Sequence, residues 1–160
     1  MSTLTPVQAV FAKVHHSTPG LTFPKTVAAL LQLGVTRYHV DYSAHTTTTY
    51  APRKSTSATA TATDTDADTP SIETEQIAIP APSAGLFKPD TPWDAAALTR
   101  AIRRVQRGET VYAEFARECV DAGVAGYFAF LTGRRVLYYG RDGDVHVEWF
   151  PGAGPTVHQQ

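Results

Sequence analysis

The chain has 160 residues, of which 42% are hydrophobic and 18% charged, with a formal net charge of −1 and one cysteine. This length and composition are typical of a single globular domain that can bury its own core. The balanced charge creates no overall field that would favour nucleic acid or an anionic membrane, and a single cysteine excludes an internal disulfide.

Two helices are predicted first along the chain. The segment "TPVQ" places Thr5 at an N-cap, Pro6 at the first helical position and Gln8 where its side chain can reach back to the cap. The second helix has an apolar stripe made of Phe23, Val27, Leu30 and Leu31. Gly34 is expected to end this helix, because glycine adopts a left-handed conformation without strain.

The hydrophobic period then changes to that of strands. Segment 37–42 alternates polar and apolar side chains, as a half-buried strand does. Its polar side chains, which should share one face, are Arg37, His39 and Asp41. Further strands are expected at "TTTTY" (46–50) and "EQIAIP" (75–80). Between them, residues 55–69 contain only Ser, Thr, Ala and Asp, so we predict a disordered insert within 52–71.

The second half is predicted to repeat this order. "TPWD" (91–94) resembles the first helix start, with Thr91 as N-cap, and a second helix is expected to end at Gly123. Strands are expected at "GYFAF", "RRVLYY" and "VHVEWFP", the last two joined by the turn "GRDGD". Residues 23–50 align with 112–139 without a gap.

We therefore predict an α+β fold. It consists of a duplicated helix-helix-strand-strand-strand unit forming one mainly antiparallel sheet, with the helices packed on one face. The chain, 1–160, is expected to be one domain of two repeats, at about 5–80 and 91–151, with the insert at 52–71 and a tail at 152–160.

Several short patterns are similar to those of a known family. They are "GV..Y.VD" from Gly34, "GE..Y" from Gly108, "GV..Y" from Gly123, and "YY..DG" from Tyr138. Together they resemble the YbcV-like family of small uncharacterised proteins, sometimes labelled phage envelope protein. The resemblance implies a fold and little chemistry. Where the first copy has Asp41, the second has Phe130, so a role that needs two symmetric acids is not supported.

One polar group is a candidate for chemistry. His39 and Asp41 alternate on the first strand, and His146 and Glu148 alternate on the last. If these strands are neighbours, two imidazoles and two carboxylates could converge for acid/base catalysis. The alternative is a solvated sheet face, which antiparallel sheets commonly have. No metal or cofactor motif is present, and none is predicted.

A second candidate is a binding surface. Phe128 and Phe130 should face the same side as Arg37, and they alternate with apolar residues, so both faces of their strand are apolar. Exposed apolar patches are usually covered by a partner.

A basic stripe is formed by Arg100, Arg103, Arg104 and Arg107. Acidic residues follow it closely, which disfavours a nucleic-acid surface there. Cys119 lies in an apolar stripe and should be a buried, inert thiol.

The leading hypothesis is a non-enzymatic protein-interaction or self-associating module that binds through the sheet face around Phe128 and Phe130. The alternative is a small-molecule-binding protein or hydrolase-like enzyme that uses His39, Asp41, His146 and Glu148. We expect a homodimer or a protein partner, no membrane and no cofactor. Nucleic acid is not an expected partner, whereas a small-molecule ligand fits the alternative. A cytoplasmic location is expected, because the N-terminal stretch lacks a basic segment followed by an apolar block.

Overall fold

The computed structural model describes residues 3–17, 20–53, 70–79, 88 and 90–154. Its helices are α1 (Pro6–His16), α2 (Phe23–Gln32), α3 (Ala95–Gln106) and α4 (Tyr112–Asp121). Its strands are β1 (Arg37–Asp41), β2 (Thr46–Arg53), β3 (Ser71–Ala78), β4 (Val124–Phe130), β5 (Arg135–Gly140) and β6 (Val145–Trp149).

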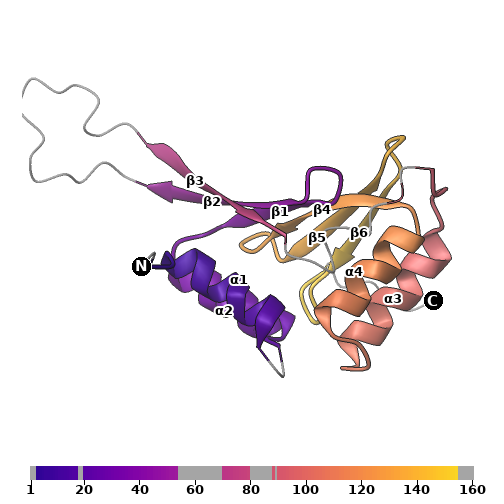
Figure 1. The fold of residues 1–160 in the computed structure, drawn as a ribbon, viewed down its shortest axis with the longest axis horizontal. Helices are drawn as coiled ribbons and strands as arrows, with labels where there is room; N and C mark the ends of the chain where they lie inside the picture. Colours follow the sequence, from indigo (N-terminus) through magenta and orange to yellow (C-terminus); the bar gives the residue numbers. More distant parts are fainter. Residues whose placement is uncertain (1–2, 18–19, 54–69, 80–87, 89, 155–160) are drawn as a thin grey trace, which may run out of the picture.

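The strands form one antiparallel sheet in the order β3-β2-β1-β4-β5-β6. The helices form two antiparallel pairs that lie against one face of this sheet, α1 with α2 and α3 with α4 (Figure 1). The predicted α+β fold is confirmed, and the order helix-helix-strand-strand-strand occurs twice along the chain. Within the described residues, no helix is both long enough and apolar enough to cross a membrane.

Local sequence signals explain where several elements begin and end. Thr5 caps α1 by accepting a hydrogen bond from the Gln8 amide (3.1 Å), while the Gln8 side chain accepts one from the Thr5 amide (2.9 Å). Gly34 and Gly123 follow α2 and α4 with φ of 84° and 88°, as predicted. The Gly34 amide donates to Leu31 and the Val35 amide to Leu30, which completes a Schellman motif.

Two predictions about the helices were wrong. Helix α3 begins at Ala95 with Asp94 as its N-cap, because the Asp94 carboxylate accepts from the Ala97 amide at 3.0 Å. Thr91 therefore lies outside the helix. Leu31, assigned to the buried stripe of α2, is 41% exposed. It follows the buried Leu30 in sequence and therefore points about 100° away from it around the helix axis.

Strand pairing also extends into the predicted insert at both ends. Pro52 pairs with Ile72 and Arg53 with Ser71, so β2 ends later and β3 begins earlier than the composition suggested. Residues 54–69 of that insert lie outside the described residues, as do residues 80–87 and 89 around the junction of the two predicted repeats, and residues 155–160 of the tail. The rest of the predicted tail, 152–154, continues from β6 in a turn in which the Ala153 amide donates to Phe150.

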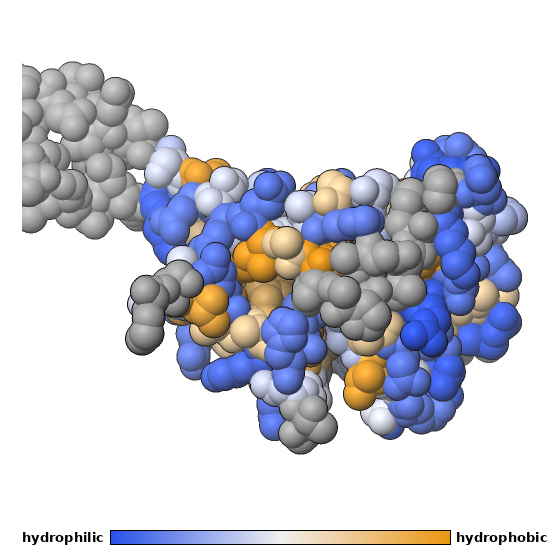
Figure 2. Space-filling model, viewed as in Figure 1, coloured by the Kyte–Doolittle hydropathy of each residue, from blue (hydrophilic) through white to orange (hydrophobic). Residues whose placement is uncertain are grey.

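The core lies between the sheet and the helices. Tyr38, Val40 and Tyr127 project from the sheet into it and pack against Phe11, Leu30, Leu98, Phe115 and Cys119 from the helices. Apolar residues gather between the sheet and the helices, whereas the outer surfaces of the helices are mainly hydrophilic (Figure 2). The predicted burial of Cys119 is confirmed, and burial raises the pKa of its thiol, which keeps it protonated.

Candidate functional site

The two faces of the sheet differ in what covers them. The face towards the helices, here the helix face, carries the buried Tyr38, Val40 and Tyr127. The opposite face, here the open face, carries the alternate residues of each strand. It includes Arg37, His39 and Asp41 of β1, opposite Phe130, Phe128 and Gly126 of β4. Among the described residues, no helix packs on the open face (Figure 1). The predicted common facing of Phe128, Phe130 and Arg37 is confirmed.

The middle of the open face is a cluster of aromatic rings around His39. The His39 imidazole stacks on Phe128 with centroids 4.1 Å apart and planes 7° apart, and Phe128 stacks in turn on Phe130 at 5.8 Å. The Nε2 atom of His39 shares a hydrogen bond of 2.6 Å with the Tyr139 hydroxyl. Gly126 makes room for this contact, because a Cβ there would collide with the Tyr139 hydroxyl and the Val40 carbonyl oxygen.

Burial determines the charge state of this pair at neutral pH. Burial lowers the pKa of His39, an effect that the nearby Asp41 partly offsets. Burial, followed by Asp41, raises the pKa of Tyr139 to about 12. Both groups are therefore uncharged near pH 7: the His39 imidazole can accept a proton, whereas the Tyr139 phenol is not ionised to an activated nucleophile.

A row of alternating aromatic and arginine side chains crosses the open face at the end of the β4–β5 turn. Its members are direct cross-strand neighbours in the order Tyr50, Arg37, Phe130, Arg135 and Trp149, from β2 to β6. The Arg37 guanidinium lies over the Tyr50 ring at 4.2 Å, and that of Arg135 over Trp149 at 4.0 Å. We call these five residues the arginine–aromatic row.

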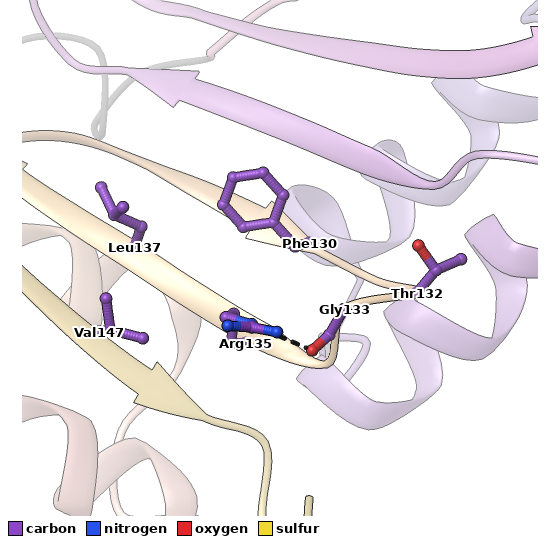
Figure 3. Close-up of a pocket in the computed structure, with 6 residues that line it drawn as sticks. All are labelled: Phe130, Thr132, Gly133, Arg135, Leu137 and Val147. Atoms are coloured by element: carbon purple, nitrogen blue, oxygen red, sulfur yellow. Dashed lines mark hydrogen bonds between the residues drawn. The ribbon is translucent and has the colours of Figure 1, made fainter. Parts of the chain in front are cut away.

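A shallow depression of about 450 Å³ lies beside this row. Phe130, Leu137 and Val147 project into it from three adjacent strands, and Thr132 and Gly133 of the β4–β5 turn close one end (Figure 3). Arg135 is held at its rim, where its Nε donates to the Gly133 carbonyl oxygen at 3.3 Å. Val147 is 43% exposed, so the depression is an open apolar surface rather than a closed cavity.

The four residues proposed for catalysis do not come together. His39 and Asp41 lie on the open face. His146 is opposite the buried Tyr138 of β5, which places it and Glu148 on the helix face. No group of three or more His, Cys, Asp or Glu side chains that could hold a metal is found among the described residues.

Glu148 instead fastens α3 to the edge of the sheet. Its carboxylate accepts hydrogen bonds from Arg103 at 2.7 Å, from His146 at 3.3 Å and from Gln106 at 3.5 Å. Burial by itself would raise the pKa of Glu148, but these donors outweigh it and lower the pKa. The carboxylate is therefore ionised and fully engaged in a structural contact.

The basic stripe on α3 is largely neutralised, as the sequence suggested. Arg103 pairs with Glu148, Arg104 with Glu118 and Arg107 with Glu109. Asp41 is likewise engaged, because it accepts hydrogen bonds from the Ser43 and Ala44 amides at 2.9 and 3.1 Å in a turn after β1.

Sequence reasoning missed four residues that shape the open face: Tyr50, Arg135, Tyr139 and Trp149. Each lies on the same face as Phe128 and Phe130 only because of the register of β2, β5 and β6. Alternation within a single strand does not give this register. For Arg135, Tyr139 and Trp149, the available signal was the pair of turns that flank β5, whose lengths set which residues face one another.

Comparison with known proteins gives one match. Residues 81–148, which extend from the segment before α3 into β6, match a family described as "Protein of unknown function (DUF1398)". No curated protein and no solved structure matches the chain. The second half of this chain is thus similar to a family of uncharacterised proteins whose description assigns no activity.

Proposed function

We propose that the protein is a non-enzymatic interaction module whose binding surface is the open face of the sheet around Phe128 and Phe130. The observation that supports this most is the uncovered apolar and aromatic surface formed by the open-face residues of β4, β5 and β6. Val145 and Val147 are 60% and 43% exposed there. Phe128 and Phe130 are half-buried, so leaving them uncovered forgoes part of the roughly 1.5–3 kcal/mol that full burial of a phenylalanine provides. Such patches usually serve as binding surfaces.

An enzymatic role has less support. The four candidate groups lie on opposite faces of the sheet, and β4 and β5 separate β1 from β6. The self-association predicted from the sequence, and the wider resemblance to the YbcV-like family, belong to this proposal. A second copy of the chain is one possible occupant of the open face.

Replacing the two phenylalanines tests whether the open face is a binding surface. The double variant Phe128→Ser, Phe130→Asp should stay folded, because both side chains lie outside the core between the sheet and the helices. The wild type should either self-associate in sedimentation velocity or, as a monomer, enhance the fluorescence of a dye that binds exposed apolar surface. The double variant should lose whichever signal the wild type shows.

A control replaces two exposed apolar side chains on the helix side of the molecule. Leu4 and Leu31 are 55% and 41% exposed. The variant Leu4→Ser, Leu31→Asp should keep the wild-type behaviour in both measurements. If the wild type is a monomer that binds no more dye than the double variant, the open face is not a binding surface and the proposal fails.

A further inference from the structure

The two open-face arginines differ from most other arginines in how their charge is satisfied. Within the described part of the chain, neither Arg37 nor Arg135 forms an ion pair, and each guanidinium lies over an aromatic ring. On the helices, by contrast, Arg103 and Arg104 are paired with carboxylates. The positive charge that remains uncompensated on the sheet is therefore concentrated in the arginine–aromatic row.

The chemistry of the row is that of a stacking platform with anion-binding groups between the rings. Phe130 stands between the two arginines, and its neighbour Phe128 continues the stack towards His39. Neighbouring strands are about 4.8 Å apart, so the row spans roughly 19 Å from β2 to β6. Proteins that bind single-stranded nucleic acid combine such aromatic platforms, on which bases stack, with basic groups that follow the phosphates.

We propose that the open face binds single-stranded nucleic acid, with bases stacked on Phe130 and Tyr50 and phosphates held by Arg37 and Arg135. This inference rests on the proposed function, because it takes the open face as the binding surface, and it names the partner. It revises the sequence-based expectation about nucleic acid. That expectation rested on the balanced net charge and on the stripe on α3, whose arginines are largely paired.

Charge favours this partner over a second copy of the chain. Among the described strand residues, the open face offers one carboxylate, Asp41, against the two guanidinium groups of the row. Asp41 is already engaged by two backbone amides. A face-to-face dimer would therefore bury at least one arginine per copy without an ionic partner, which is costly. A nucleic acid supplies one phosphate per nucleotide.

The test measures fluorescence anisotropy of labelled oligothymidine and oligouridine, each of about 12 nucleotides, a length suited to one such site. The wild type should bind these single strands more tightly than the duplex of the same length. The variant Arg37→Gln, Arg135→Gln should lose affinity by about tenfold or more. Its dependence of log K on log salt should be shallower by about 1.4, the contribution of two phosphate contacts on a single strand. Comparing the two oligonucleotides shows whether DNA or RNA is preferred.

Substitutions at Phe130 test the stacking separately from charge. Phe130→Leu keeps an apolar side chain but removes the ring, and it should weaken binding by about 5- to 150-fold, the range for losing one stacked base. Phe130→Tyr keeps the ring and should bind like the wild type. Thermal unfolding of each variant checks that the loss is not due to unfolding.

The charge control is Arg100→Gln, Arg117→Gln, which removes two exposed arginines from the helix side. It should change affinity less than about twofold, since these side chains are remote from the open face. The inference is overturned if the wild type binds no single strand at low salt, or if this control loses as much affinity as the row variant. It is also overturned if the wild type forms a dimer that is lost in the Phe128→Ser, Phe130→Asp variant and kept in the two arginine variants. In that last case the proposed function stands and only the nucleic-acid partner is excluded.

Discussion

Gly123→Ala is expected to lower the free energy of unfolding by about 2–5 kcal/mol, a large part of the roughly 5–15 kcal/mol of a typical domain. Gly123 has φ of 88°, a conformation that costs a residue with a Cβ about 1–2 kcal/mol. The new Cβ would also lie 2.5–2.7 Å from the backbone of Pro92 and Trp93. That backbone is held by the hydrogen bond from the Asp94 amide to the Ala122 carbonyl oxygen at 2.8 Å. Overpacking of this kind adds about 1–3 kcal/mol.

Two other glycines that follow helices separate the two contributions. Gly108 follows α3 with φ of 74° and has nothing within 4 Å of its Cβ position, so Gly108→Ala should cost only the conformational 1–2 kcal/mol. At Gly34 the Cβ would meet the movable end of the Arg53 side chain, and the loss should be similar to that at Gly108. Urea unfolding followed by circular dichroism measures all three. Equal losses of unfolding free energy at Gly108 and Gly123 would contradict the prediction, because they would show that the backbone at 92–93 moves to accommodate the new Cβ at little cost.

The fold was largely predictable because its signals are local. The cap at Thr5 and the glycines at 34 and 123 fix helix ends through hydrogen bonds a few residues long, and these predictions are confirmed. The start of α3 was misplaced because "TPWD" offers two caps, and the Asp94 carboxylate, not Thr91, accepts the hydrogen bond from the first turn. Alternation within β1 and β4 correctly placed Phe128 and Phe130 on the face of Arg37.

The candidate site was less predictable because it depends on pairing between strands. A shift of one residue in register moves every side chain of a strand to the other face. The β5–β6 register sets His146 opposite Tyr138, and this alone moves His146 and Glu148 to the helix face. The same register sets Trp149 opposite Arg135 and so completes the arginine–aromatic row. The β5–β6 register therefore completes the surface that we propose as the binding site. The predicted catalytic group is separated both by this register and by the strand order, which places β4 and β5 between β1 and β6.

Acid should destabilise the protein through His15, which lies at the end of α1 with its ring 5.0 Å from that of Tyr112. Burial, and then the neighbouring His16, lower the pKa of His15 from 6.5 to about 4. The unfolded chain therefore binds a proton at His15 that the folded chain does not, between pH 6.5 and 4. Stability from this residue is present above pH 6.5 and is lost as the pH falls to about 4. The pKa difference corresponds to about 2–3 kcal/mol after allowance for the partial exposure of the ring.

The variant His15→Phe isolates this effect, because it keeps an aromatic ring beside Tyr112 and removes the titrating group. Carboxylates also titrate as the pH falls, so the informative quantity is the difference between variant and wild type. The free energy of unfolding in urea should fall by about 2–3 kcal/mol less in the variant between pH 7 and pH 4. His16→Gln, which changes an exposed neighbour, should keep most of the acid sensitivity of the wild type. If His15→Phe loses as much stability in acid as the wild type, then the His15 ring is not held neutral by the packing of α1 against α4.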